Sequence, residues 1–266
     1  MKISKLLSFL AIAVLFTFFA SVSQAHFGMV IATPLTVMDS AKSTISLDIK
    51  FWHPFENSGM NLVKPVSFKV YNGGQATDLL ASLKEVKFKT FTTYNLEYKI
   101  PKPGLYTFVL EPQPYFEPAE DKFIIHYTKT YVDAFGDDEG WNEPTPGLKT
   151  EIVPLVKPNA LYAGNVFTGK ILLDGKPVPG GEVEIEWYPG PDKKGVAPYE
   201  SLVTQVVVAD ENGNFSFAAP VAGYWGFAAL NDADYKLKHD GVDKDVELGA
   251  VLWLYFYPFQ AAVAAN

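Results

Sequence analysis

The sequence predicts an all-β protein. Short runs in which apolar and polar residues alternate recur along the chain, and a period of two is the pattern of a strand with one buried face. Aromatic residues make up 15% of the 266 residues, and 20 glycines and 19 prolines are spread among the runs. Many short strands separated by turn residues are typical of a β-sandwich.

The first part of the chain contains most of these runs. The Asn72-Gly73-Gly74 turn closes one of them, because asparagine and glycine adopt the positive φ of tight hairpin turns. A single short helical turn is predicted over 78–84. We expect strands, in chain order, over 27–37 as an edge strand, 44–51, 66–71, 94–100, 105–110, 123–132 and 148–155.

A second set of runs follows Pro158, with Asp174-Gly175 and Asn212-Gly213 at its turns. Together with 164–171, 183–186 and 214–217, these segments resemble the transthyretin-like or carboxypeptidase-regulatory-like sandwich. We therefore predict two β-sandwich domains of the immunoglobulin-like or transthyretin-like kind. Their expected bounds are 26–157 and 158–266, with residues 1–25 as a separate leader.

The leader has the three parts of a secretory signal peptide. Lys2 and Lys5 form a basic head, an apolar run follows over 6–20, and the small residues Ser23 and Ala25 mark a cleavage site. Cleavage after Ala25 would make His26 the first residue of the mature protein. We therefore expect a periplasmic protein that is soluble after signal cleavage.

Composition excludes several classes of function. The formal charge is −8 and loss of Lys2 and Lys5 takes it to −10, so nucleic acid is not an expected partner. The chain has no cysteine, which excludes thiolate metal sites and a cysteine nucleophile. Nucleophile elbows, phosphate loops and zinc-protease helices are also missing from the sequence. We predict a binding protein and not an enzyme.

Three of the four histidines form the predicted metal site. A free amine on His26 can bind a divalent cation together with Nδ1 of the same residue, because its unperturbed pKa is only about 8. His53 continues the apolar face of the 44–51 strand, and His126 lies in an apolar strand. If 27–37 pairs as an edge strand, His26, His53 and His126 converge into a site of nitrogen donors, which suits nickel, cobalt or copper.

Other residues near these segments leave alternatives open. Glu56 is a possible carboxylate ligand close to His53, whereas His239 lies in a charged loop and is predicted not to be a ligand. A terminal histidine with a second histidine also suits a copper-binding oxidative enzyme of the monooxygenase type. A structural sandwich without metal is a third interpretation.

Several segments together resemble a known family. These are Ala25-His26-Phe27-Gly28-Met29, His53-Pro54-Phe55-Glu56, 59–65, 111–121, 123–130, 134–137, 140–141, 225–230 and 235–241. They are similar to the periplasmic proteins encoded beside energy-coupling-factor nickel and cobalt transporters. The resemblance implies an extracytoplasmic protein that binds Ni²⁺ or Co²⁺ and delivers it to a membrane uptake transporter.

Overall fold

The computed structural model describes residues 26–137 and 139–260, and the predicted signal peptide lies outside them. Strands dominate these residues, and their only helices are three short 3₁₀ turns. The helical turn predicted over 78–84 is one of these. The turns are η1 (Ser40–Lys42), η2 (Leu80–Ser82) and η3 (Glu200–Leu202). The all-β prediction is confirmed.

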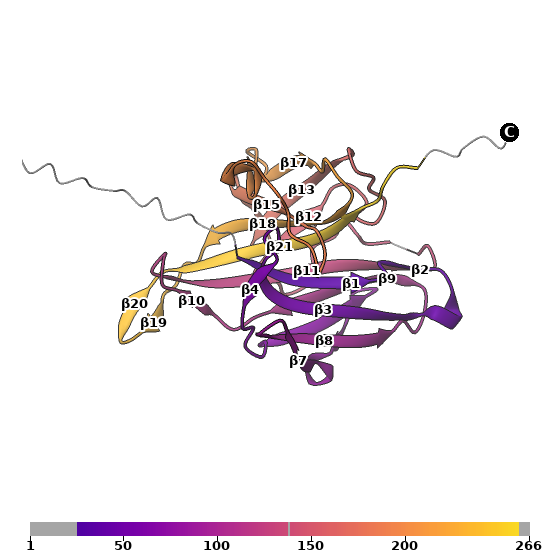
Figure 1. Cartoon of the computed structure of the whole chain (residues 1–266), viewed down its shortest axis with the longest axis horizontal. Helices are drawn as coiled ribbons and strands as arrows, with labels where there is room; N and C mark the ends of the chain where they lie inside the picture. Colours follow the sequence, from indigo (N-terminus) through magenta and orange to yellow (C-terminus); the bar gives the residue numbers. More distant parts are fainter. Residues whose placement is uncertain (1–25, 138, 261–266) are drawn as a thin grey trace, which may run out of the picture.

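Three stacked layers make up the molecule (Figure 1). The lower layer is a five-stranded antiparallel sheet in the order β1-β3-β8-β7, with β4 paired to β3. Its strands are β1 (Phe27–Thr33), β3 (Thr44–His53), β4 (Ser58–Met60), β7 (Lys84–Phe88) and β8 (Phe91–Lys99). The edge strand considered for 27–37 is present only in part: β1 lies at the end of this sheet, whereas Thr36–Val37 pair with the next sheet.

The middle layer is a ten-stranded sheet in the order β16-β15-β18-β21-β11-β9-β5-β6, with β2 and β10 also paired to β11. Its strands are β2 (Thr36–Val37), β5 (Ser67–Asn72), β6 (Gln75–Asp78), β9 (Gly104–Glu111), β10 (Tyr115–Glu117), β11 (Lys122–Ala134), β15 (Glu182–Tyr188), β16 (Gln205–Val208), β18 (Gly223–Asp232) and β21 (Val246–Phe256).

The upper layer is a four-stranded sheet, and a separate two-stranded hairpin extends from one end of the molecule (Figure 1). The sheet contains β12 (Thr150–Pro154), β13 (Val166–Leu173), β14 (Lys176–Pro177) and β17 (Asn214–Ala218), and the hairpin contains β19 (Leu237–His239) and β20 (Val242–Lys244). Strand β12, expected as the last strand of the first domain, belongs to this upper sheet.

The predicted boundary at residue 157 does not separate the sheets. Strand β11 of the N-terminal segment (26–157) pairs in parallel with β21 of the C-terminal segment (158–266) over Phe123↔Val246 to Thr130↔Trp253. The prediction of two self-contained sandwiches is therefore wrong. The physical reason lies in the composition of these strands, which are buried along almost their whole length and must be covered on both faces.

Each face of the middle sheet covers a separate core. Ile49, Phe68 and Phe108 belong to the core against the lower sheet, whereas Phe167 and Phe227 belong to the core against the upper sheet. A third cluster contains Phe27, Met29 and Trp52 from the lower sheet and Val251 and Trp253 from β21. Strand β1 is therefore buried on both faces, which fixes the position of the residue that precedes it.

Candidate metal-binding site

The pairing of β1 with β3 brings His26 and His53 together. The ladder pairs Phe27 with Trp52, so the next pair outward is His26 with His53. Directly opposite residues of an antiparallel pair point to the same face of the sheet. The two imidazole rings lie with their centroids 4.4 Å apart. Two imidazoles that share one metal ion, each bonded at about 2 Å, need a close approach of this kind.

A buried carboxylate contacts the outer nitrogen of His26. Nε2 of His26 lies 3.3 Å from Oε2 of Glu117, and the other oxygen of Glu117 accepts a hydrogen bond from the backbone N–H of Ala119. In metal sites, a ligating histidine commonly donates its second ring N–H to a carboxylate, which fixes the tautomer and the ring orientation. With a proton on Nε2 facing Glu117, the lone pair of the ring would lie on Nδ1, on the same residue as the predicted free amine.

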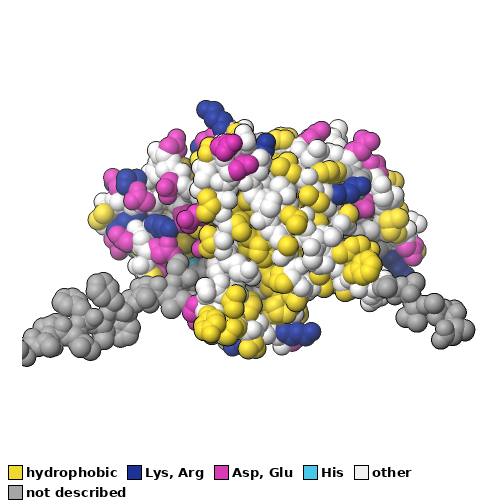
Figure 2. Space-filling model, turned by 90° about the horizontal axis from the view of Figure 1, so that it is seen from above, with side chains coloured by type: hydrophobic (Ala, Val, Ile, Leu, Met, Phe, Trp, Pro, Cys, Tyr) yellow, Lys and Arg dark blue, Asp and Glu magenta, His cyan; other side chains and the backbone are white. Residues whose placement is uncertain are grey.

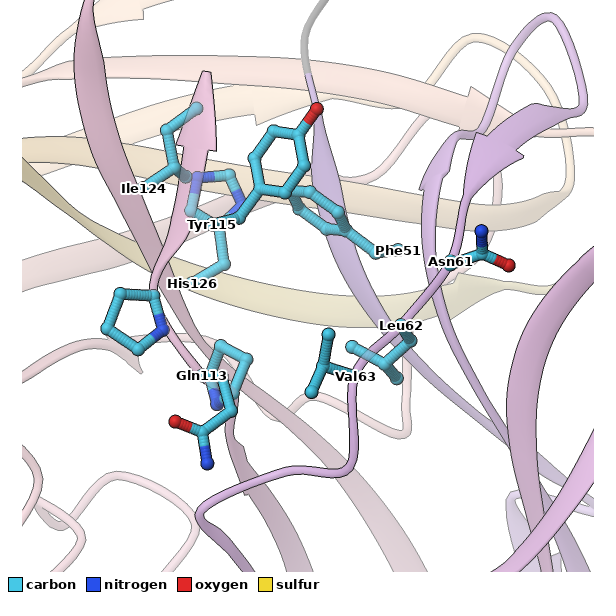
Figure 3. A pocket seen from close by; sticks show the side chains of 10 residues that line it. Phe51, Asn61, Leu62, Val63, Gln113, Tyr115, Ile124 and His126 are labelled. Atoms are coloured by element: carbon cyan, nitrogen blue, oxygen red, sulfur yellow. The ribbon is translucent and has the colours of Figure 1, made fainter. Parts of the chain in front are cut away.

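Aromatic side chains surround the ring of His26. The rings of Phe51 and Tyr115 lie 5.5 Å and 5.9 Å from that of His26. The same two residues, with His126, line one end of a small apolar cavity of about 50 Å³ (Figure 3). Val63 and Gln113 lie at its other end in the same view. The cavity has room for a few water molecules or one small group.

His126 lies on the other side of Phe51, with the two ring centroids 5.9 Å apart. It is almost fully buried, with a relative exposure of 3%. Its ring occupies space left by Gly249, where a Cβ would lie 2.2 Å from Cδ2 of His126. A Cβ on Gly28 would lie 2.2 Å from Oγ1 of Thr128 and 3.2 Å from the Cβ of His126. The backbone N–H of Gly28 donates to Nδ1 of His126 over 3.4 Å, and Nε2 lies 3.7 Å from Glu247.

The predicted site residues therefore have two different arrangements. His26 and His53 are in contact, whereas the nitrogens of His126 face Gly28 and Glu247. Among residues 26–137 and 139–260, no group of three or more His, Asp or Glu side chains is arranged to hold a metal ion. A site at His26 and His53 needs a donor of another kind, and the free amine of a mature His26 would be one.

Carboxylates outnumber cations around His126. Lys122 contacts Glu120 and Glu247 at 2.6 Å and 2.5 Å. Burial raises the pKa of Glu247, but His126 and Lys122 outweigh burial and the pKa lies below its usual range. Burial, and then repulsion from Glu247 and Glu120, raises the pKa of Glu184 to about 7. The electrostatic potential of this region is therefore negative, which favours a nearby cation.

The turn after His53 is hydrogen-bonded to another buried carboxylate, that of Glu186. Oε2 of Glu186 accepts a hydrogen bond from the backbone N–H of Phe55 over 3.3 Å, and Thr204 donates to Oε1. Burial raises the pKa of Glu186 to about 8, although these two hydrogen bonds act in the opposite direction. Glu56, the predicted possible ligand, lies on the same turn, and its charge adds to the shift at Glu186.

His239 has a different environment, at the end of β19. Its ring stacks on Phe116 with centroids 3.7 Å apart and planes 12° apart, and 40% of its side chain is exposed. The hairpin around it carries the ion pairs Lys238–Asp243, Lys236–Asp245 and Lys244–Asp121. Figure 2 shows charged side chains of both signs gathered at this end of the molecule. The charged surroundings expected for His239 are present.

Sequence reasoning did not identify Glu117 or Glu186 as neighbours of the histidines. Glu117 reaches His26 because the short strand β10 pairs with β11. Glu186 lies on a strand in which Glu182, Glu184 and Glu186 alternate with Val183 and Ile185. This alternation predicts a half-exposed face, whereas in the fold Glu186 is buried and contacts Phe55 and Thr204.

Comparison with known families assigns the chain to one of them. The model of a domain of unknown function, DUF4198, matches residues 23–233, and the chain belongs to this family. No curated protein matches the chain. No helix in the described part of the chain combines the length and apolar character needed to cross a membrane.

Solved structures show only distant similarity. The D0-D1 domain of Intimin is 14% identical, with 88% of this chain and 100% of that chain covered and a TM-score of 0.27. The fibronectin(III)-like modules of Clostridium thermocellum CbhA are 12% identical, with 90% and 100% covered and a TM-score of 0.22. A two-domain fibronectin type-III segment of chicken tenascin is 10% identical, with 86% and 99% covered and a TM-score of 0.21. Scores this low carry no argument about function.

Proposed function

We propose that this protein is a periplasmic carrier that binds Ni²⁺ or Co²⁺ and delivers it to a membrane uptake transporter. The observation that carries the proposal is the His26–His53 pair, with ring centroids 4.4 Å apart and Glu117 at Nε2 of His26. Removal of a signal peptide before His26 would add an amine to the two imidazoles. The resemblance described above supplies the transport role.

The donor set suits a transition metal better than calcium or magnesium. An amine and two imidazoles are nitrogen ligands of intermediate softness, whereas Ca²⁺ and Mg²⁺ require oxygen. His126 remains a predicted fourth donor, and joining the site would require its ring to leave the space at Gly249. We therefore base the proposal on His26 and His53 and treat the contribution of His126 as a separate question.

A second candidate is a copper-binding oxidative enzyme. It is favoured by one observation, namely that the side chains in contact are two histidines, of which one carries the predicted free amine. Cu²⁺ binds such sites more tightly than Ni²⁺ or Co²⁺ in the general order of divalent affinities. Against it, the side chain of His26 is only 13% exposed and lies under Phe51 and Tyr115. Oxidation of a large substrate requires a more open metal.

Titration calorimetry on two forms of the protein tests the proposal. One form begins at His26, as verified by mass spectrometry, and the other carries one extra residue that converts the amine into an amide. The native form should bind one Ni²⁺ or Co²⁺ tightly, and the extended form should bind at least about 100-fold more weakly, because the chelate has lost one donor. Equal affinity of the two forms would refute the terminal chelate.

Two further outcomes separate the alternatives. Failure of both forms to bind Ni²⁺, Co²⁺ or Cu²⁺ would favour a purely structural sandwich. Oxygen consumption by the copper-loaded native form with ascorbate, above that of free copper, would favour the oxidative enzyme. Copper binding without that activity would keep the carrier and change its cargo.

A further inference from the structure

The turn that follows His53 is held in place by the C-terminal segment. His53 is the last residue of β3 and lies opposite Ser58 of β4, so residues 54–57 form the tip of a hairpin. The backbone N–H of Asn57 donates to the carbonyl of Pro54 over 3.2 Å and closes the tip. Asn57 has a φ of 51°, in the left-handed region that asparagine tolerates better than most residues.

The side chain of Asn57 connects this tip to a loop more than 130 positions away in the sequence. The two hydrogens of its Nδ2 are shared among three backbone carbonyls, those of Gly190 at 3.1 Å, Pro191 at 2.6 Å and Lys193 at 2.8 Å. Its Oδ1 accepts from Nε1 of Trp52, the residue before His53, at 3.0 Å. Asn57 is only 2% exposed. The amide therefore uses both its donor and its acceptor capacity, in a place from which water is excluded.

Further contacts to the same tip come from β15 and the segment after it. The backbone N–H of Gly195 donates to the carbonyl of Phe55 over 2.7 Å, and Glu186 accepts from the N–H of Phe55 over 3.3 Å. Gly195 has no room for a side chain, because a Cβ there would lie 2.3 Å from the ring of Phe55. The tip is thus held at Phe55 and Asn57, by residues 186–195.

From this geometry we infer that Asn57 and the 190–195 loop are positioning elements that set the orientation of His53 toward His26. His26 is fixed by the β1–β3 ladder and by Glu117, and His53 by the turn and by Asn57. A preformed arrangement of two ligands raises metal affinity, because less ordering is left to binding. The inference rests on the proposed metal site. It gives the C-terminal segment a part in that site, although His239, the histidine of this segment, is not a ligand in it.

Asn57→Asp tests these hydrogen bonds most directly. It keeps the shape of the side chain and replaces the NH₂ donor by an oxygen that faces three carbonyls. Gly195→Ala is the second variant and acts on Phe55 from the other side. Lys193→Ala is the matched control, because it removes an exposed side chain and leaves the carbonyl that Asn57 uses. Phe167→Leu, in the core against the upper sheet, controls for loss of stability alone.

Two measurements are made on each folded variant. The first is the NMR signals of the His26 and His53 imidazoles in the metal-free protein. Asn57→Asp and Gly195→Ala should shift them, and Lys193→Ala and Phe167→Leu should not. The second is the affinity and the visible absorption spectrum with Co²⁺. Affinity should fall about 10-fold or more in the first two variants, with an altered spectrum.

The outcomes separate this inference from the proposed function. Unchanged imidazole signals in folded Asn57→Asp and Gly195→Ala would overturn the positioning role, whether or not metal binds. An equal loss of affinity in Phe167→Leu would also overturn it, because the effect would then follow stability alone. If wild-type protein binds no metal while the imidazole signals shift as expected, the proposed function fails and the positioning of His53 stands.

Discussion

His53 and His126 face the same core and lie on neighbouring layers, yet they differ in what surrounds them. His53 lies at the end of a strand, opposite His26, on a turn held by hydrogen bonds. His126 lies in the middle of a strand, between two glycines, with its nitrogens directed at Gly28 and Glu247. A histidine on an apolar strand is therefore placed to share a metal ion where the ladder pairs it with another donor.

The largest expected difference between the two is in metal affinity. His53→Ala removes an imidazole from the contacting pair and should weaken Ni²⁺ or Co²⁺ binding by about 100-fold or more, equivalent to about 2.7 kcal/mol. His126→Ala should weaken it by less than about 10-fold. Calorimetry on the form that begins at His26 measures both. A loss with His126→Ala as large as with His53→Ala would support the three-histidine site predicted from the sequence.

The space around His126 can be tested through Gly249. Gly249→Ala places a methyl group 2.2 Å from the imidazole, and should destabilise the protein by about 1–3 kcal/mol through overpacking. Urea denaturation gives this value. The double variant Gly249→Ala with His126→Ala should recover part of the loss, because the methyl group then has room. Additive losses would show that the glycine is needed for another reason.

Glu186, beneath the turn of His53, should make stability depend on pH. Its folded-state pKa of about 8 lies above the ordinary value of 4.5, so the fold favours the neutral acid. The corresponding stability is complete below about pH 4.5 and is lost as pH rises through about 8, with an expected size on the order of 5 kcal/mol. Glu186→Gln should flatten the pH dependence of the urea midpoint. A midpoint that falls as steeply in this variant would assign the effect to other groups, with Glu184 the first to test.

Glu117 lies closer to Nε2 of His26, at 3.3 Å, than Glu247 lies to Nε2 of His126, at 3.7 Å. Glu117→Gln keeps the size of the side chain and removes the charge, and we expect affinity to fall about 10-fold, the lower end of the range for residues that support a metal ligand. Metal titration with a thermal melt as the stability control measures it. An unchanged affinity would mean that Glu117 only fills space beside the histidine.

The smallest effect is expected at His239. His239→Ala removes a ring stacked on Phe116 and should cost about 1 kcal/mol of stability at most. Metal affinity should stay the same, since the stacked ring faces Phe116 and the charged hairpin. Loss of metal binding in this variant, with the fold intact, would add His239 to the site and contradict the sequence prediction.

Three of the five strands of the lower sheet, β1, β3 and β8, were predictable from the sequence, whereas β4 and β7 were not. Alternation over 44–51 predicts β3 and its inward face, and the same pattern brings Leu47, Ile49 and Phe51 into the core. The N-terminal strand was predicted at the edge, and β1 lies there. Periodicity is local, and it is enough to predict which face of a strand is buried. It is also enough to suggest that His26 and His53 could meet.

Only the tertiary structure decided how the two segments are joined. Strands β11 and β21 are buried on both faces, and such runs do not reveal which strands they pair with. Their parallel pairing joins segments more than 120 residues apart and makes one middle layer for two cores. The contacts of Glu117, Asn57 and Glu186 depend on that assembly. Because they arise between elements far apart in the chain, no spacing of residues in the sequence could have predicted them.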